Sequence, residues 1–218
     1  MNVIKLAQDD KYYPNKLKSI YDPPELLYCL GDIRLLNEPS IAIVGTRNAS
    51  NYGKRIAYNL SQELSKRGVT IISGLASGID SYAHEGAFKN VGKTIAVLGS
   101  GIDVIYPKEN EDLYKSIIKN GGLIVSEFPL GTKPEKDNFP KRNRIISGLS
   151  DGVVVVEAKK KSGALITADL ALEQGRSVFA VPGNIDSQNS EGTNNLIKEG
   201  AVPVTSYLDI LIAIAERP

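Results

Sequence analysis

Gly45, Thr46 and Arg47 directly follow an apolar run at 41–44. A short, continuously apolar run predicts a strand that is buried on both faces of a parallel sheet, and ligands of such sheets bind beyond the carboxyl ends of the strands. A glycine at that point lets the backbone approach a ligand, and a following helix start presents free N–H groups to an anion. A guanidinium can hold a phosphate through two parallel hydrogen bonds. The sequence therefore predicts an anion site around Arg47.

A second junction of this kind follows the apolar run at 69–73. Its small and hydroxyl-bearing residues are Ser73, Gly74, Ser77 and Gly78. Backbone N–H groups in such a loop can receive a phosphate. The alternative is structural: Ser77 caps the next helix, and the glycines allow a close contact between strand and helix. Because this run is expected beside the first strand, we interpret the loop as facing the same crevice as Arg47.

A basic segment with an aromatic ring lies at 133–144. Its candidates for contact with a single strand are Phe139, Lys141, Arg142, Asn143 and Arg144. Cations follow the nucleic-acid backbone, and a ring provides a stacking surface worth about 1–3 kcal/mol per base. Composition alone slightly favours the alternative, a solvated loop with a buried phenylalanine, since Glu135 and Asp137 cancel part of the charge.

A third loop, Lys161, Ser162 and Gly163, follows the apolar run at 153–157 and precedes a helical pattern. Glycine-rich loops at 182–184 and 191–195 come after the last strong apolar run, without the cations. The carboxyl ends of parallel strands lie at one edge of a sheet, so these loops are expected to converge there. Their convergence predicts a polyanion or a nucleotide in the crevice.

Two standard nucleotide motifs are not matched. A P-loop needs four residues between its glycines and then lysine with serine or threonine, whereas Gly45 and Gly53 are too far apart and Lys54 precedes Arg55. The stretch at 99–101, Gly-Ser-Gly, lacks the third small residue of a dinucleotide fingerprint. A tight turn is the favoured interpretation there.

Asp80 and His84 stand four residues apart and share one face of an expected helix. Such a pair can perform acid–base chemistry in a nuclease or hydrolase. The favoured alternative is a hydrogen-bonded pair that packs the helix near the crevice. We assign no catalytic residue, no metal site and no cofactor, because His84 is the only histidine, Cys29 is the only cysteine, and the carboxylates form no recognisable metal-binding pattern.

Composition sets the class of protein. The chain has 218 residues, 42% of them hydrophobic and 23% charged, which suits one large globular domain or one domain with a small appendage. The net charge of +1 gives no overall attraction for nucleic acid, so any basic surface must be local. A single cysteine excludes an intramolecular disulfide, and no signal peptide or membrane-spanning run is recognisable. We therefore expect a cytoplasmic protein without membrane contact.

The alternation of strands and helices predicts an α/β fold. Strands are expected at 41–45, 69–73, 94–98, 123–126, 153–157 and 178–181. Helices are expected at 52–67, 79–89, 110–120, 140–149 and 164–174. This order predicts a Rossmann-like, doubly wound, mostly parallel sheet with helices on both faces. Residues 1–40 are expected to form a lead-in packed on the core domain at 41–218, with an added edge strand at 26–30, and a closing helix is expected at 206–217.

Motifs along the chain resemble those of the DNA-processing protein A (DprA/Smf) family of bacterial natural transformation. The matching stretches are 45–47, 73–80, 83–84, 99–101, 106–107, 126–127, 139–146, Glu157, 162–164, 182–183 and 191–194. They run in the family's order across residues 20 to 205. So many collinear matches are specific.

The resemblance implies an extended Rossmann fold that binds single-stranded DNA, forms a homodimer and loads the recombinase RecA. Arg47 would hold a backbone phosphate, Phe139 would contact a base or support the pocket, and Lys141, Arg142 and Arg144 would line or brace the groove. The loop at 73–78 would supply backbone donors. The helical SAM-like domain and the winged-helix-like domain of many members are not recognisable, so we expect a trimmed or minimal member.

Two rival functions remain open at this stage. The first is a nucleotide or phosphoribosyl hydrolase that uses the same crevice, although the Pro-Gly-Gly-x-Gly-Thr loop of such enzymes is matched poorly at 182–184 and 192–193. The second is a recruitment scaffold whose main function is protein–protein contact. Release of a base from nucleoside monophosphates distinguishes the hydrolase from a DNA-binding protein.

Overall fold

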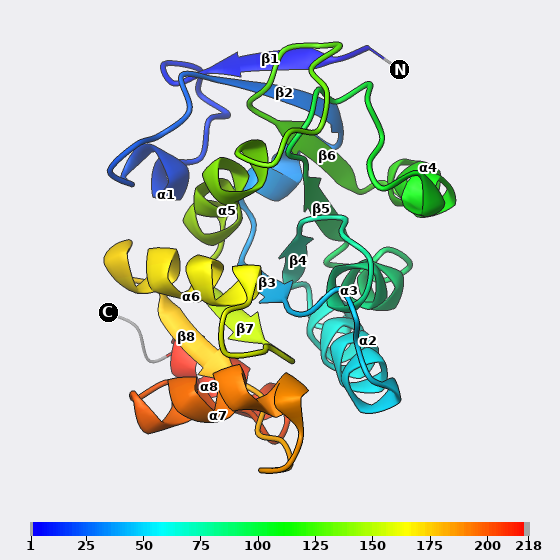
Figure 1. Cartoon of the computed structure of the whole chain (residues 1–218). Helices are drawn as coiled ribbons and strands as arrows, with labels where there is room; N and C mark the ends of the chain where they lie inside the picture. The colour runs from blue at the N-terminus through cyan, green and yellow to red at the C-terminus, as the bar shows by residue number, and fades with distance from the viewer. Residues whose placement is uncertain (1, 216–218) are drawn as a thin grey trace.

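A nine-stranded sheet forms the centre of the computed structural model, which describes residues 2–215 (Figure 1). The strand order is β1-β2-β6-β5-β4-β3-β7-β8-β9. The strands are β1 (Ile4–Ala7), β2 (Leu26–Gly31), β3 (Ser40–Val44), β4 (Thr70–Ser73), β5 (Thr94–Val97), β6 (Leu123–Ser126), β7 (Gly152–Val155), β8 (Ser177–Ala180) and β9 (Val202–Pro203). From β6 to β9 neighbouring strands are parallel, whereas β1 and β2 join antiparallel.

Helices cover both faces of this sheet. They are α1 (Asn15–Lys18), α2 (Asn51–Lys66), α3 (Ile79–Ala87), α4 (Glu111–Lys119), α5 (Asn138–Leu149), α6 (Gly163–Glu173), α7 (Glu191–Lys198) and α8 (Tyr207–Ala215). Short 3₁₀ turns occur at Ile33–Asn37, Lys108–Asn110 and Gln188–Ser190. Apolar side chains of α1, α5, α6 and α7 pack on one face, and those of α2, α3, α4 and α8 pack on the other.

The alternation of side chains along β3 shows how one strand serves both layers. Ile41 and Ile43 join the core under α2 and α3, while Ala42 and Val44 join the core under α5 and α6. Every residue of β3 is buried, which explains why its sequence is continuously apolar rather than alternating. The predicted doubly wound, mostly parallel α/β sheet with helices on both faces is confirmed.

The expectation of an edge strand at 26–30 is wrong. β2 lies between β1 and β6, and β1 forms the edge instead. The sequence did not indicate β1 because it has only four residues, of which only Leu6 is buried. The two-residue β9 and the helix α7 were also missed, since α7 carries a glycine and two asparagines, which favour helices weakly. The expected helix at 206–217 is observed as α8, and positions 216–217 lie outside the described residues.

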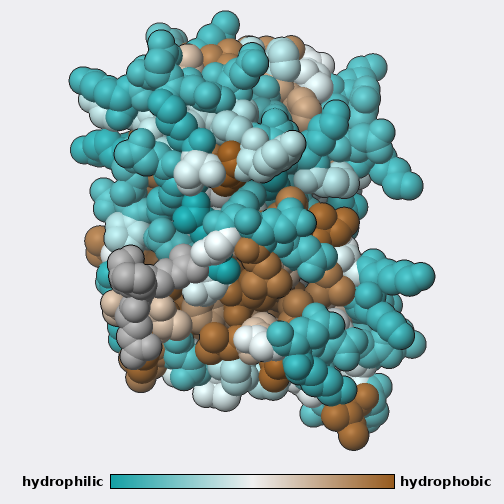
Figure 2. Space-filling view, turned by 90° about the vertical axis from the view of Figure 1, so that its left-hand side faces the viewer, coloured by the Kyte–Doolittle hydropathy of each residue, from teal (hydrophilic) through white to brown (hydrophobic). Residues whose placement is uncertain are grey.

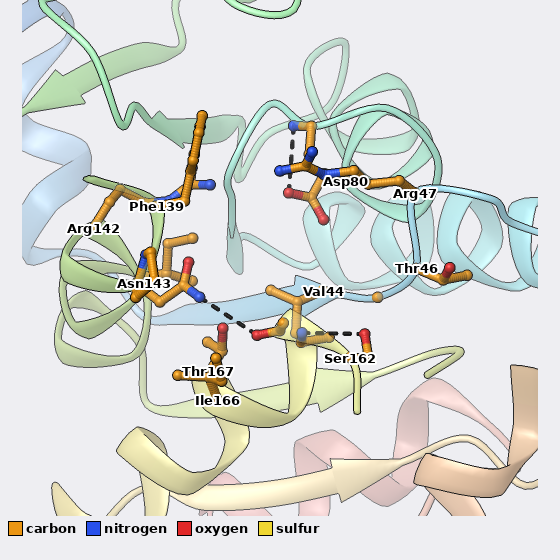
Figure 3. A pocket seen from close by; sticks show the side chains of 16 residues that line it. Val44, Thr46, Arg47, Asp80, Phe139, Arg142, Asn143, Ser162, Ile166 and Thr167 are labelled. Carbon is orange, nitrogen blue, oxygen red and sulfur yellow. Dashed lines mark hydrogen bonds between the residues drawn. The ribbon is translucent and has the colours of Figure 1, made fainter. Parts of the chain in front are cut away.

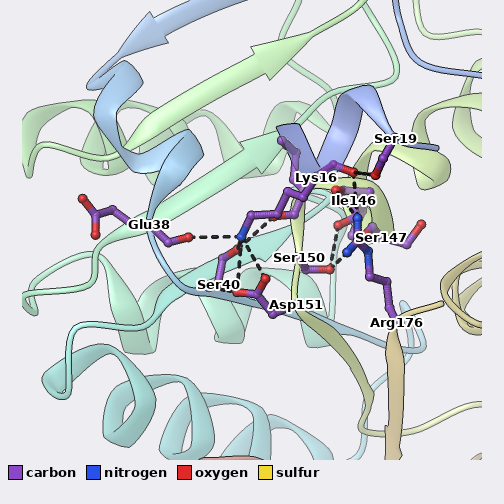
Figure 4. A network of polar contacts seen from close by, with 11 residues as sticks. Lys16, Ser19, Glu38, Ser40, Ile146, Ser147, Ser150, Asp151 and Arg176 are labelled. Atoms are coloured by element: carbon purple, nitrogen blue, oxygen red, sulfur yellow. Dashed lines mark hydrogen bonds and ion pairs between the residues drawn. The ribbon is translucent and has the colours of Figure 1, made fainter. Parts of the chain in front are cut away.

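Polar contacts fasten the first forty residues to the sheet (Figure 4). The Lys16 Nζ atom donates to the Asp151 carboxylate at 3.1 Å and to the Ser40 hydroxyl at 3.0 Å. Arg176 donates from Nη2 to the Lys16 carbonyl at 2.7 Å. Burial lowers the pKa of Lys16, and Asp151 opposes that shift. The lead-in is thus held by side chains at the starts of three strands, with Ser40 in β3, Asp151 just before β7 and Arg176 just before β8.

No helix within residues 2–215 combines the length and the apolar character needed to cross a membrane.

Candidate nucleic-acid interface

A crevice opens where the winding of the sheet reverses direction. After β3 the chain winds outward through β4, β5 and β6, and it then returns to add β7 on the other side of β3. Ligands of open α/β sheets bind at such a switch point, beyond the carboxyl ends of the strands. A cavity of about 270 Å³, the crevice cavity, lies there between the loop after β3, the start of α5 and the start of α6 (Figure 3).

Ten of the fifteen residues predicted to contact DNA line this cavity or a smaller one beside it. The crevice cavity is lined by Gly45, Thr46, Arg47, Phe139, Arg142, Asn143, Ser162 and Gly163. The neighbouring cavity, of about 70 Å³, shares Arg47, Phe139 and Arg142 and adds Gly74, Ser77 and Tyr106. We call it the Tyr106 cavity. The structure therefore brings together residues that are up to 118 positions apart in the chain, from Gly45 to Gly163.

Arg47, Phe139 and Tyr106 form a stack at the wall that the two cavities share. The Arg47 guanidinium carbon lies 5.5 Å from the centre of the Phe139 ring, and the ring centres of Phe139 and Tyr106 are 5.7 Å apart. Arg47 is exposed and has no hydrogen-bond or ion-pair partner within residues 2–215. A cation and two rings thus lie together at the mouths of the two cavities.

Tyr106 is a site residue that the sequence reasoning did not select. The only signal was its place in the Tyr106-Pro107 stretch, which matched the family but suggested no role. It reaches Phe139 because the loop after β5 turns back over the start of α5. A residue in a loop without helical or strand periodicity cannot be placed by pattern alone.

Gly99 makes room for the Phe139 ring. A Cβ atom at position 99 would lie 2.9 Å from Phe139 Cδ1 and 3.2 Å from Cε1, closer than real side chains approach. The stretch at 99–101 is therefore a turn at the end of β5, as favoured, and its first glycine also positions the stacking ring. Any side chain at position 99 displaces Phe139.

Arg142 is a buried brace. Its Nη1 atom donates to the Gly74 carbonyl at 2.7 Å and to the Val97 carbonyl, which links α5 to the ends of β4 and β5. Only 5% of its surface is exposed. Burial lowers the pKa of Arg142 to about 10, with Asp80 opposing the shift, so the guanidinium stays charged at neutral pH. Arg142 therefore lines both cavities and also braces α5 against the ends of β4 and β5.

Asp80 occupies the backbone donors that were expected to bind phosphate. Its Oδ2 atom accepts hydrogen bonds from Gly74 N at 3.0 Å and from Ala76 N at 3.4 Å. The Ser73 hydroxyl donates to the Ile43 carbonyl, and Gly78 packs against the backbone of the loop after β3. The expectation of free donors in the loop at 73–78 is therefore wrong for its first half, because a carboxylate of this chain already satisfies them.

The expected hydrogen-bonded pair of Asp80 and His84 is also wrong. The Thr94 hydroxyl donates to the Ile71 carbonyl, so its oxygen accepts a hydrogen bond from His84 Nδ1–H, 2.7 Å away. His84 is fully buried, and burial together with the nearby charge of Arg142 lowers its pKa to about 3. A neutral histidine inside the helix layer packs α3 onto β5.

Three predicted cations do not line either cavity. Lys141 and Lys161 are exposed beside the crevice. Arg144 turns away, and it forms ion pairs with Glu127 at 2.5 Å and with Asp22 at 3.1 Å. The expectation that Arg144 lines the groove is therefore wrong; its guanidinium ties α5 to the lead-in.

The loops after β8 do not converge on the crevice as expected. Residues of 182–184 and 191–195 line two other cavities, and the start of α7 rests on the loop after β7. The buried Glu157 carboxylate does not contact the crevice either. It accepts hydrogen bonds from the backbone N–H and hydroxyl of Ser50, which fixes the start of α2.

The start of α6 forms the floor of the crevice. The Ser162 hydroxyl accepts a hydrogen bond from Ala164 N at 3.3 Å and caps the helix, while Asn143 Nδ2 lies 3.5 Å from the Gly163 carbonyl. Thr167 lies one turn further along the same wall. An anion entering the crevice would thus meet a helix N-terminus on one side and Arg47 on the other.

Comparisons with known proteins find relatives that cover most of this chain. The chain is 50% identical to DNA processing protein DprA of Bacillus subtilis over its full length and 72% of that protein, and 49% identical to protein Smf of Escherichia coli over 94% of this chain and 55% of that protein. The crystal structure of DNA processing protein A from Streptococcus pneumoniae superposes with a TM-score of 0.92, at 46% identity, and covers all of this chain and 75% of that one.

A second solved structure concerns the single-stranded-DNA binding mode of DNA processing protein A from Helicobacter pylori. It has a TM-score of 0.84 and 34% identity, over 99% of this chain and 97% of that one. Molybdenum cofactor carrier proteins share the fold alone, with TM-scores near 0.56 and at most 22% identity. The sequence matches the family described as DNA recombination-mediator protein A over residues 5–215, and the chain belongs to that family.

Proposed function

We propose that this chain binds single-stranded DNA in the crevice at the switch point of the sheet, and that it acts in DNA processing during transformation or recombination. One observation carries the proposal: the exposed Arg47 guanidinium has no partner within residues 2–215 and is held on the Phe139 ring at the mouth of the crevice cavity. An exposed cation beside two aromatic rings suits a phosphate flanked by unpaired bases. The Helicobacter pylori relative, whose structure concerns its binding of single-stranded DNA, supports the same ligand.

The direct test compares single-stranded and double-stranded DNA. In fluorescence anisotropy titrations, a labelled oligo-dT is expected to bind at least tenfold more tightly than a duplex of equal length, because stacking rings require unpaired bases. Binding is expected to weaken as salt rises, since phosphate contacts release counterions. Equal affinity for both forms would contradict the proposal, as would affinity that does not change with salt.

We propose further that this function is not enzymatic. The two groups considered for acid–base chemistry already have internal partners, Asp80 with the backbone N–H groups of Gly74 and Ala76, and His84 with Thr94. These contacts support a structural role for both side chains.

We propose a homodimer through the end of the molecule that carries α8 and β9. Figure 2 shows apolar surface gathered in the lower half of the face on view. Exposed apolar side chains at this end are Leu172, Val202, Leu208 and Ile212. Sedimentation velocity is expected to show a dimer that the pair Leu208→Glu and Ile212→Glu dissociates, while Val91→Glu, at an exposed apolar position in the loop after α3, leaves it intact. A monomeric wild type would refute this surface.

On the family resemblance, we propose that the protein delivers the bound strand to RecA and acts in the cytoplasm.

We also propose that residues 41–218 form one DNA-binding unit onto which 1–40 are packed. The antiparallel pairing of β2 with β6 supports this division, because the lead-in adds strands to the sheet rather than forming a core of its own. The chain spans 72% of the Bacillus subtilis relative and about half of several others, so these statements concern this portion alone.

A further inference from the structure

A loop of three consecutive lysines separates the crevice from a larger hollow. Lys159, Lys160 and Lys161 are exposed and have no ion-pair partner among the described residues. On one side they lead directly into Ser162 and Gly163, which line the crevice cavity. On the other side Lys160 lines a cavity of about 490 Å³, which we call the α7 cavity.

The position of the lysine loop is fixed by the start of α7. Gly192 N donates to the Ala158 carbonyl at 2.8 Å, and Ala158 N donates to the Asn189 carbonyl at 2.8 Å. A Cβ atom at Gly192 would lie 2.8 Å from the Ala158 carbonyl oxygen and 3.1 Å from that of Lys159. Because α7 rests directly on the backbone of the loop, the two cavities have a set position relative to each other.

The walls of the α7 cavity offer the groups that a nucleotide needs. Lys160 and Lys198 supply cations for phosphate, and neither has an ion-pair partner within residues 2–215. Ile185 is 98% exposed at the rim and presents an apolar surface on which a base can lie. The Asn195 side chain lines the cavity without a hydrogen-bond partner among the described residues, so its amide is available to a base edge.

The opposing charge at this cavity is small. Glu191 is the single acidic side chain among the residues that line it. Two lysines, Lys160 and Lys198, line the cavity against this one carboxylate. Of the residues next to the lining in sequence, Lys159 and Lys161 add positive charge, and Asp186 and Glu199 add negative charge. Asn194, by contrast, is occupied, since its side chain pairs with both the N–H and the carbonyl of Gly183 and shapes the wall. The balance therefore favours a polyanion over a cationic or neutral ligand.

We propose that the α7 cavity is a second subsite for single-stranded DNA, and that a strand bound at Arg47 passes over Lys159–Lys161 into it. This inference rests on the proposed function of the crevice. The subsite takes a phosphate between Lys160 and Lys198 and a base against Ile185. A short oligonucleotide fills the crevice alone, whereas a longer one occupies both sites.

The test uses oligo-dT of two lengths, about 6 and about 25 nucleotides, which bracket the usual size of single-strand sites. Each phosphate contact makes the slope of log K against log salt more negative by about 0.7, and it raises the affinity roughly fivefold in about 0.1 M salt. Because both lysines contact the same phosphate, the double variant Lys160→Gln, Lys198→Gln is expected to bind the long oligonucleotide about fivefold more weakly, with a slope that is less negative by about 0.7. Its affinity for the short one is expected to be unchanged.

The matched control replaces two exposed lysines elsewhere, Lys18→Gln in α1 and Lys119→Gln in α4. It therefore has the same net charge as the Lys160→Gln, Lys198→Gln variant. Neither lysine has an ion pair among the described residues. An equal loss in the control would mean that net charge, and not the α7 cavity, carries the effect. Unchanged long-oligonucleotide binding by the Lys160 and Lys198 variant would overturn the subsite, even where Arg47→Ala shows that the crevice binds DNA.

A crosslink tests the path of the strand directly. Cys29 is buried, so Ile185→Cys adds one accessible thiol. An oligo-dT of about 25 nucleotides whose bases carry a mixed disulfide is expected to crosslink to this cysteine by thiol–disulfide exchange, which releases the small leaving thiol, and one of about 6 nucleotides is not. Lys119→Cys serves as the control. Crosslinking at position 185 that is no faster than at position 119 would exclude the proposed path.

Discussion

Arg47→Ala is expected to weaken the binding of oligo-dT by about ten- to a hundredfold while leaving the fold intact. A hydrogen bond between charged groups contributes about 1.5–3 kcal/mol, and each 1.4 kcal/mol corresponds to a factor of ten in affinity. Arg47 is exposed and makes no hydrogen bond or ion pair within residues 2–215, so its removal leaves no buried group unsatisfied. Anisotropy titrations in several salt concentrations measure both the affinity and the slope.

The salt dependence separates a phosphate contact from a packing effect. If Arg47 neutralises one phosphate, the negative slope of log K against log salt becomes shallower by about 0.7 in the alanine variant. Arg47→Lys keeps the charge but loses the planar fork that stacks on Phe139, so we expect an unchanged slope with an intermediate affinity.

Arg55→Ala is the matched control for Arg47→Ala. Arg55 is also exposed, lies 5.9 Å from the ring centre of Tyr52 and lines neither the crevice cavity nor the Tyr106 cavity. Its removal is expected to change the affinity for oligo-dT less than twofold, because a surface charge far from the bound DNA contributes little to binding. Wild-type affinity in the Arg47 variant, or an equal loss in the Arg55 variant, would refute the assignment of Arg47.

The contrast between Arg47 and Arg142 shows what the sequence can and cannot predict. Both arginines stand near strand-to-helix junctions, and both were expected at the groove. The sheet that brings them together was predictable, because strands buried on both faces have continuously apolar sequences. The burial of one and the exposure of the other were not, since they depend on where α5 docks against the ends of β4 and β5.

Asp80 illustrates a second limit. Its position at the start of a helix was visible in the sequence, and so was the glycine-rich loop before it. Whether the N–H groups of that loop bind an external phosphate or an internal carboxylate depends on the orientation of the Asp80 side chain. The spacing of residues in the sequence does not predict that orientation. Tyr106 was not selected, and the loops after β8 were placed wrongly, for a related reason, because irregular connections carry no periodicity.

Arg142→Met is expected to lower the free energy of unfolding by about 3–5 kcal/mol. The Gly74 and Val97 carbonyls lose their buried donor, which costs about 1–3 kcal/mol for each unsatisfied group. The buried Asp80 carboxylate also loses a nearby positive charge, although the two side chains form no ion pair among the described residues. Arg142→Lys retains a charge and is expected to lose less, so it stays measurable where the methionine variant is largely unfolded. Denaturant titration gives the values, and Arg47→Ala is the control, expected within about 0.5 kcal/mol of wild type.

The loss of unfolding free energy in Arg142→Met, relative to wild type, is expected to become smaller as the pH falls. Burial raises the pKa of Asp80, and Arg142 is the largest influence that opposes the rise. Without Arg142 the folded protein takes up the Asp80 proton at a higher pH than the unfolded chain does, so acidification relieves the buried charge, by up to about 1.4 kcal/mol per pH unit. His84 acts in the same direction, since the charge of Arg142 contributes to its low pKa in the wild type. A deficit that stays constant between pH 7 and about pH 5 would show that packing, and not the charge of Asp80, makes Arg142 necessary.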